Sequence, residues 1–328
     1  WEQISDKMKA YYRSLMLSKV DLNENCFFDL VPPRFLSEYC RMRVEITKHV
    51  LETYEKPENY DYLLKMTKLL TKISHNELNI DLSSLNSVMH RENARRFRKK
   101  AENLPKYISY NLFGTKTGRL STKKGSFPIM NINKEYRSIV RPKNDYFLEL
   151  DFNAAEVRTL LALAGSKQPR MDIHAWNLAQ GMGDNVESRE DAKKAFFSWL
   201  YDEKKINNNL EEIYHRNQVR ESHFKGNKVT TPFGNTMEAD HHHALSYLIQ
   251  GTTAEMVLRQ AIKIDEFLKE HKSFISFTVH DSVIVDMPAD ETHLARKLVS
   301  IFGDTELGHF LVNSSVGSDF GNMKGTNK

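Results

Sequence analysis

The sequence predicts an α+β fold, on three observations. Apolar residues between Phe35 and Leu51 recur at helical spacing in a charged first third of the chain. Residues 146–152 form a short apolar and aromatic stretch typical of a strand, followed at once by helix-forming residues. Near the C-terminus, residues 274–279 and 283–287 read as two strands of a hairpin.

Composition bounds the class of protein. The chain has 328 residues, 40% of them hydrophobic, so it can bury a large core, and its length predicts two or three lobes. Cys26 and Cys40 lack the spacing of a zinc site or a disulfide framework, which favours a reducing intracellular compartment, cytoplasmic or organellar. Residues 1–20 are amphipathic and broken by charge, so neither a signal peptide nor a membrane span is expected there.

The first third of the chain predicts three helices. They cover residues 35–51, residues 60–73 and a basic stretch at 84–103, separated by Pro57 and by residues 76–81. The third helix carries a dense basic run: Arg91, Arg95, Arg96, Arg98, Lys99 and Lys100. Such a run is usually a solvated helix face, and contact with nucleic acid is the alternative. The net charge of +4 only permits an anionic partner.

The middle of the chain alternates strand and helix. Asp151 lies where the strand at 146–152 ends, and a helix at 154–164 follows until Gly165. Two helices are expected between residues 172 and 204, separated by Gly181-Met182-Gly183-Asp184. Ser188 followed by Asp191 resembles a capping box, so the second of these helices is expected to begin there. A compact hairpin is expected at residues 226–234.

Two aspartates on separate strands are candidates for a metal site. Asp151 ends one strand, and Asp281 lies between the two strands of the C-terminal hairpin. Magnesium prefers oxygen ligands, and two such ions can hold the attacking and leaving oxygens of a phosphoryl transfer. The alternative is that each aspartate only ends a strand or caps a helix.

A charged and aromatic helix face is the second candidate site. Arg189, Lys193, Phe197 and Tyr201 are spaced four apart, so they follow one slowly drifting face of a helix. Two cations followed by two aromatic rings suit a nucleoside triphosphate lying along that helix. The alternative is an ordinary amphipathic helix with its aromatic residues in a core.

These motifs together resemble the family A (polymerase I-like) DNA polymerases. Residues 151–158, DFNAAEVR, are similar to the motif A pattern D-Y-S-Q-I-E-L-R. The face from Arg189 to Tyr201 resembles motif B, R-x3-K-x3-F/Y-x3-Y-G, and His280-Asp281-Ser282 resembles motif C, H-D-E. Further similarities follow in the family order at residues 117–121, 172–174 and 250–255.

The resemblance implies roles for individual residues at the reaction centre. Asp151, Asp281 and the backbone carbonyl of Phe152 would bind two Mg2+ ions, with Mn2+ as a substitute. Lys193, Arg189 and His174 would hold the triphosphate, and Lys193 is the candidate proton donor to pyrophosphate. Phe197 would pack on the incoming nucleotide, Tyr201 would lie at the end of the same helix near the templating base, and Glu156 would exclude a 2′-hydroxyl.

The resemblance also implies DNA contacts and partners. Four residues would touch primer or template near the terminus: Arg119, Arg158, Gln250 and His280. Arg95 and Lys99, on the basic helix, would touch the duplex backbone. The expected partners are primer-template DNA and dNTPs, without a membrane. Because the sequence begins with Trp1, we expect a piece of a longer protein, in which an exonuclease or helicase domain upstream, or replisome proteins, are further candidate partners.

A right-hand architecture is the fold that the resemblance implies, with a palm containing an antiparallel sheet and with helical thumb and fingers. The expected boundaries are 1–30 for the start of the palm, 31–105 for the thumb, 106–165 for the palm, 166–247 for the fingers and 248–328 for the remaining palm. The implied activity is template-directed DNA synthesis without a proofreading exonuclease in this chain. The source is open, and a viral origin is among the readings.

Two departures from the family pattern leave other functions open. Ser282 stands where the family has Glu, so a third carboxylate is missing or supplied elsewhere, and Asp202 replaces the glycine after the motif B tyrosine. A catalytically silent polymerase-like DNA-binding factor is therefore one alternative. A single-subunit RNA polymerase is another, against which Glu156 argues.

Three further patterns are interpreted as structural. Asp304-Thr305-Glu306 has the D-x-E spacing of an exonuclease motif but lacks a preceding apolar strand. Three adjacent imidazoles, at residues 241–243, would point in different directions on a helix and are not expected to share a metal. Residues 317–321 lack the Lys-Ser/Thr pair of a phosphate-binding loop and predict a turn.

Overall fold

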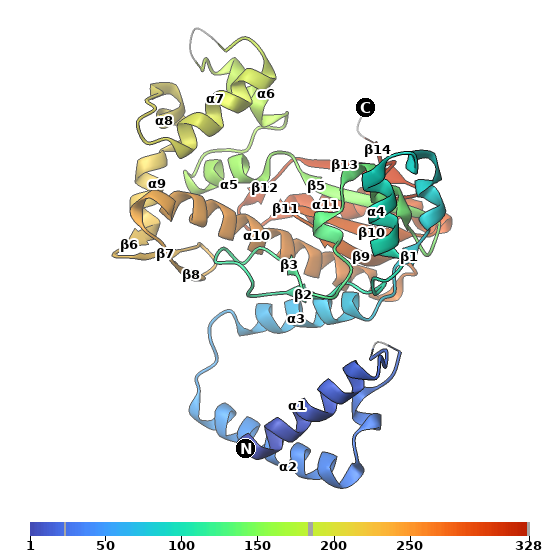
Figure 1. Cartoon of the computed structure of the whole chain (residues 1–328). Helices are drawn as coiled ribbons and strands as arrows, with labels where there is room; N and C mark the ends of the chain where they lie inside the picture. Colours follow the sequence, from blue (N-terminus) through green and yellow to red (C-terminus); the bar gives the residue numbers. More distant parts are fainter. Residues whose placement is uncertain (23, 183–185, 327–328) are drawn as a thin grey trace. The chain divides into compact units, whose positions relative to one another are not determined.

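The computed structural model describes residues 1–22, 24–182 and 186–326. The chain forms two compact units, Trp1–Tyr60 and Asp61–Lys328, which are described separately (Figure 1). The boundary between them falls inside the segment 31–105 that the sequence assigned to one thumb.

The first unit is helical. Its elements are α1 (Glu2–Leu17), a short 3-10 helix (Phe27–Leu30) and α2 (Pro33–Thr53). Pro33 begins α2, a position where the missing N–H of proline costs nothing. Tyr11 of α1 packs on Phe35 of α2 with ring centroids 5.3 Å apart. Few apolar side chains are buried: among the residues described in this unit these are Met8 and Val31.

The second unit contains the remaining elements. Its helices are α3 (Tyr60–Ser74, which begins in the first unit), α4 (Glu92–Ala101), α5 (Ala155–Leu163), α6 (Ile173–Ala179), α7 (Arg189–Tyr201), α8 (Asn208–Tyr214), α9 (Arg216–His223), α10 (His241–Phe267) and α11 (Ala295–Gly303). Its longer strands are β5 (Tyr146–Phe152), β9 (Phe274–Val279), β10 (Ser282–Met287) and β13 (Val312–Gly317). The short strands are β1 (Asn79–Ile80), β2 (Tyr110–Asn111), β3 (Ser121–Thr122), β4 (Val140–Arg141), β6 (Phe224–Lys225), β7 (Lys228–Thr230), β8 (Thr236–Glu238), β11 (Asp304–Thr305), β12 (Gly308–His309) and β14 (Lys324–Gly325).

A five-stranded antiparallel sheet forms the centre of this unit, in the order β14-β13-β5-β10-β9. Strand β5 is therefore paired along both edges. Its residue Asp151 lies opposite Ser282 of β10 on one side and opposite Asn313 of β13 on the other. This register fixes which side chains share a face of the sheet.

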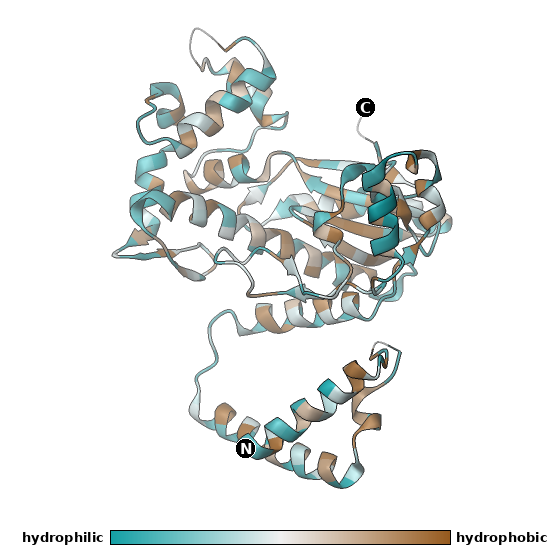
Figure 2. Ribbon diagram, viewed as in Figure 1, coloured by the Kyte–Doolittle hydropathy of each residue, from teal (hydrophilic) through white to brown (hydrophobic). Residues whose placement is uncertain are grey.

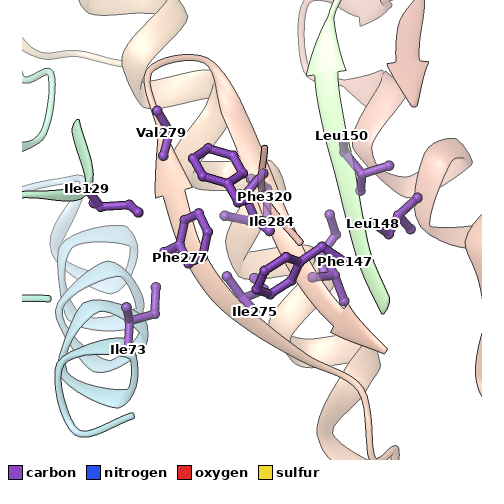
Figure 3. Close-up of a cluster of buried hydrophobic side chains, with 14 of the residues drawn as sticks. Ile73, Ile129, Phe147, Leu148, Leu150, Ile275, Phe277, Val279, Ile284 and Phe320 are labelled. Carbon is purple, nitrogen blue, oxygen red and sulfur yellow. The ribbon is translucent and has the colours of Figure 1, made fainter. Parts of the chain in front are cut away.

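The two faces of the sheet bury different partners. On one face Phe152 stacks on Phe302 of α11, with ring centroids 4.2 Å apart. On the other face Phe147, Phe277 and Phe320 pack edge to face, as Figure 3 shows. The apolar strands stand out against the polar outer side of α4 in Figure 2. The sheet is thus held between apolar layers, and β5 carries two acidic side chains, Glu149 and Asp151.

Helix α10 is the longest helix and connects the sheet to the rest of the unit. Gln260 of α10 donates hydrogen bonds to the carbonyls of Ile301, Phe302 and Asp304, at the end of α11. Near its start, α10 contributes Ala244, Leu245, Leu248 and Ile249 to a second apolar cluster. A single rigid helix therefore spans both apolar cores of the unit.

The second apolar cluster holds helices α6 to α9 together. Phe196 of α7 lies against Tyr214 of α8 with ring centroids 4.9 Å apart, and the Tyr214 hydroxyl donates to Asn177 of α6 at 2.7 Å. The three-stranded sheet β6-β7-β8 adds Val229 and Met237 to this cluster. These elements make up most of the segment that the sequence assigned to the fingers.

Most elements expected from the sequence are present. Helices α2, α3, α5, α6 and α7, strands β5, β9 and β10, and the hairpin near residues 226–234 all lie where the sequence predicted them. The basic segment 84–103 is an exception, because residues 82–88 form a 3-10 helix anchored by buried Leu85, and α4 begins only at Glu92. Gly183 and Asp184 of the predicted α6–α7 linker lie outside the described residues. Within the described residues no helix is both long and apolar enough to cross a membrane.

Candidate active site

Asp151 and Asp281 come together at the ends of neighbouring strands. Asp151 of β5 is the register partner of Ser282, and Asp281 is the residue directly before Ser282. Val279 pairs with Ser282 in the β9–β10 hairpin, which leaves His280 and Asp281 at its tip. His280 has a left-handed backbone with φ of 53°, as tight hairpin tips require. The structure therefore brings together two carboxylates that lie far apart in the sequence.

Both carboxylates are held in a way that disfavours their charge. Burial raises the pKa of Asp151 to about 7, helped by the negative charges of Glu149 and Asp281 and opposed by a hydrogen bond from Asn313. Burial also raises the pKa of Asp281, where Arg119 opposes the shift and Glu156 adds to it. A divalent cation would relieve this repulsion, and oxygen-only donors of this kind suit Mg2+.

Glu149 is a third acidic residue of this region that the sequence did not single out. It precedes Asp151 by two positions in a strand, so both side chains point to the same face of the sheet. Burial raises its pKa, while Arg137 and a hydrogen bond with Ser282 lower it. The alternation in Glu149-Leu150-Asp151 was the signal that could have identified it. No group of three or more His, Cys, Asp or Glu side chains is arranged around a metal position within the described part of the chain.

Glu156 is fixed from two sides. One of its carboxylate oxygens accepts a hydrogen bond from Arg119, and the other accepts one from the Tyr201 hydroxyl at 3.0 Å. Tyr201 also bonds to Gln250 of α10, and burial together with Glu156 raises its pKa. Four predicted site residues, contributed by separate segments, therefore converge at one point. Arg119 also lines a cavity of about 280 Å³ together with His280 and Asp281.

Helix α7 presents the predicted face. The Ser188 hydroxyl accepts a hydrogen bond from the Asp191 N–H at 3.1 Å, so the expected cap begins the helix. The rings of Phe197 and Tyr201 stack with centroids 6.0 Å apart. Three other side chains of α7 fill the apolar core instead: Phe196, Trp199 and Leu200. On the predicted face Arg189, Lys193 and Tyr201 are exposed, whereas Phe197 is half-buried and also packs against the core.

His174 lies beneath this face. Its ring is 98% buried, next to Phe196 and Phe197 at centroid distances of 6.4 and 6.1 Å. Burial lowers its pKa, with Arg189 and Lys193 acting in the same direction and Asp172 against it, which favours the neutral ring. Among the described residues its Nδ1 atom has no hydrogen-bond partner.

The placement of Arg158 corrects one prediction. Its side chain is fully buried and donates hydrogen bonds to the carbonyls of Asn153, Pro169 and Met171 at 2.6–2.9 Å. A guanidinium whose donors are used inside the protein has nothing left to offer a phosphate. The prediction that Arg158 contacts DNA is therefore wrong for this structure, in which Arg158 anchors the loop that leads into α6.

The other side chains predicted to contact DNA differ in their exposure and in the hydrogen bonds that they already make. His280 is exposed at the hairpin tip, and Lys99 is exposed on α4. Arg95 is also exposed, but its guanidinium donates to the carbonyls of Met89 and His90, just before its own helix. Three neighbours in the basic run form ion pairs with acidic residues: Arg91 with Glu135, Arg96 with Glu92 and Arg98 with Glu102. The basic run is thus partly neutralised.

Comparison with known proteins adds a likeness in fold. Neither the known family models nor the curated protein sequences contain a match to this chain. Among solved structures, it resembles one described as "POL domain of Pol1 from M. smegmatis complex with DNA primer-template and dNTP". The TM-score is 0.63 at 14% identity, over 90% of this chain and 74% of that chain. The chain has a polymerase-like α+β fold.

Proposed function

We propose that this chain is a family A, template-directed DNA polymerase that adds dNMPs to a primer 3′ end. The observation that supports the proposal most is the meeting of Asp151 and Asp281 at adjacent strand ends of an antiparallel sheet. The same unit carries the cationic and aromatic face of α7. The fold likeness is to a polymerase domain whose structure contains primer-template and dNTP.

In this proposal Asp151, Asp281 and the Phe152 carbonyl would hold two Mg2+ ions. The ions would supply Lewis-acid stabilisation of the attacking and leaving oxygens. Arg189 and Lys193 bind the triphosphate, and Lys193 holds the proton that the departing pyrophosphate takes up. Phe197 packs on the incoming nucleotide, and Tyr201 lies near the templating base.

Glu156 would select the sugar. A carboxylate fixed by both Arg119 and Tyr201 cannot easily turn away, so it blocks the space of a 2′-hydroxyl. This rigidity favours dNTPs over NTPs. Gln250, bonded to the same tyrosine, and His280 at the hairpin tip contact the primer-template.

In the same proposal the five-stranded sheet is the palm and the cluster around α6 to α9 belongs to the fingers, while Lys99 on α4 touches the duplex backbone. The proposed activity includes no proofreading exonuclease in this chain. The two alternatives, RNA synthesis and DNA binding without catalysis, keep the same fold but change what the site does.

Primer extension tests the proposal directly. The chain is mixed with primer-template and Mg2+, and dNTPs and NTPs are offered separately, with Asp281→Asn as the inactive control. Extension with dNTPs that is lost in the control supports the proposal. Extension with NTPs would instead show an RNA polymerase. Duplex binding without any extension would show a silent DNA-binding factor.

A further inference from the structure

We infer that Asp172 is a positioning residue that orients Arg189 toward the triphosphate of the incoming nucleotide; this rests on the proposed function. Asp172 grips one edge of the Arg189 guanidinium, accepting from Nε at 3.0 Å and from Nη2 at 2.9 Å. A planar guanidinium held at two points by a carboxylate has a fixed direction. Its remaining nitrogen, Nη1, is thereby directed away from Asp172.

Asp172 is itself fixed by the backbone of α6. Its Oδ1 atom accepts from the N–H groups of His174 at 3.1 Å and Ala175 at 3.0 Å, as the N-cap of that helix. Hydrogen bonds from Arg189 and from Asn153, together with these N–H groups, hold the pKa of Asp172 well below its usual range despite its partial burial. The carboxylate is ionised at every pH at which the protein would work.

A hydrogen-bonded connection runs from Asp172 to the metal-bearing strand. Asn153, two residues after Asp151, donates to Asp172 Oδ2 at 2.9 Å. The Asn153 side-chain oxygen accepts from the Ile173 N–H at 3.2 Å and from Arg158 at 3.1 Å. Through Asn153 and Asp172, Arg189 is held at a fixed position relative to the end of β5 that carries Asp151. The connection sets the distance between the triphosphate cation and the proposed metal position.

The free edge of Arg189 is held only weakly. Nη1 donates to Glu190 at 2.6 Å, but the Glu190 side chain is 66% exposed, whereas that of Asp172 is 26% exposed. Exposed ion pairs contribute little, so a phosphate can displace Glu190 from Nη1 while Asp172 keeps its grip. The Nε/Nη2 edge of Arg189 therefore stays on Asp172, whereas Nη1 can exchange Glu190 for a phosphate.

The test compares dNTP binding by three variants. Equilibrium binding of the correct dNTP is measured on a dideoxy-terminated primer-template, where no bond can form. Asp172→Asn keeps a helix cap but loses the charge, and should raise the dNTP Kd about tenfold. Glu187→Gln removes an exposed charge just before α7 and should leave the Kd unchanged. Glu190→Gln should lower the Kd, because it removes the competitor for Nη1.

Steady-state kinetics and a double variant complete the test. Asp172→Asn should raise KM for dNTP while changing kcat less than about twofold, because the lost orientation acts on binding. Arg189→Lys should raise KM for dNTP by the same factor. The double variant Asp172→Asn/Arg189→Lys should raise it no more than either single variant. If Asp172→Asn does not fold, the dNTP Kd of Arg189→Lys is compared with and without Glu190→Gln. A lysine cannot bind Asp172 and a phosphate through separate edges, so Glu190→Gln should no longer lower the Kd in the lysine variant.

The outcomes separate this inference from the proposed function. If the wild-type chain binds no dNTP, the proposed function fails. If it binds dNTP and Asp172→Asn binds as tightly, or if kcat falls while KM is unchanged, Asp172 does not position Arg189. Weaker binding by Glu190→Gln would also overturn the inference, because Nη1 would then not be the exchangeable edge.

Discussion

At the scale of single residues, the unusual feature of the site is that its carboxylates are destabilised where they lie. Asp151 has a pKa of about 7 because it is buried beside Glu149 and Asp281. A raised carboxylate pKa gives a penalty to the folded state that is absent below pH 4, grows as the pH rises toward 7, and is complete above it. The site is thus strained in the absence of a cation, and function rather than stability explains its residues.

Asp151→Asn should therefore be more stable than the wild-type chain. Without divalent ions at pH 8 we expect its free energy of unfolding to be higher by roughly 1–2 kcal/mol, with no difference at pH 4. Primer extension should fall on the order of a thousandfold. Denaturant unfolding at the two pH values checks this, and an equal gain at both would contradict the charge origin. Added Mg2+ should stabilise only the wild type.

Glu156→Ala should relax sugar selection. The loss of a carboxylate fixed by Arg119 and Tyr201 opens the space next to the sugar. We expect the ratio of kcat/KM for dNTP to that for NTP to fall by about tenfold or more. Single-nucleotide incorporation measures this ratio, with Glu156→Gln, which keeps the bulk, as the control. Equal selection by the alanine variant would remove Glu156 from this role.

At the scale of elements, the loop between α5 and α6 depends on one buried cation. Arg158 of α5 holds the carbonyls of Pro169 and Met171, and it also holds Asn153 at the end of β5. Burial lowers the pKa of its guanidinium to about 10, with Asp172 opposing this shift. The two sides of the loop are therefore tied together at a single point.

Arg158→Ala should destabilise the chain instead of weakening DNA contact. We expect a loss of about 3–5 kcal/mol, because several buried carbonyls lose their donor. Thermal unfolding gives the size of the effect, and Lys99→Ala is the exposed control with a change close to zero. A variant that folds normally but binds duplex DNA weakly would restore the original assignment of Arg158 as a DNA contact.

The sequence predicted those parts of the elements and of the site that depend on a few neighbouring residues. The Ser188 cap, the strand ending at Asp151 and the hairpin tip at Asp281 each depend on a few adjacent residues. The burial of Arg158 could not be predicted, because arginine side chains are mostly exposed to solvent. The ion pair of Arg189 with Asp172 likewise depends on how two helices pack. The 3-10 turn before α4 was missed because its buried anchor, Leu85, has tertiary contacts that a single sequence does not reveal.

At the scale of the whole molecule, the chain divides after Tyr60 into two units that differ in how much apolar surface they bury. The larger unit contains both apolar cores, whereas the smaller one buries few side chains. Residues 54–58, between α2 and α3, are exposed. A helical pair with so little buried area depends on other contacts for its stability.

Limited proteolysis should therefore cut between the units first. Chymotrypsin is expected to cleave after Tyr54, which is 76% exposed, before it cuts α3 or the sheet, leaving a resistant fragment that begins near residue 55. Mass spectrometry of the early fragments identifies the position. An early cut within residues 61–326, with the bond after Tyr54 intact, would contradict this division.

The central position of β5 has a consequence for how the protein moves. Strand β5 is bonded to β10 along one edge and to β13 along the other, so its amides open to solvent only when the whole sheet separates. In deuterium exchange the amides near Leu150 should be among the last to label, and those at the start of α7 among the first. In the proposed polymerase, α7 would move relative to the sheet when a nucleotide binds, while the strand that carries Asp151 stays in place.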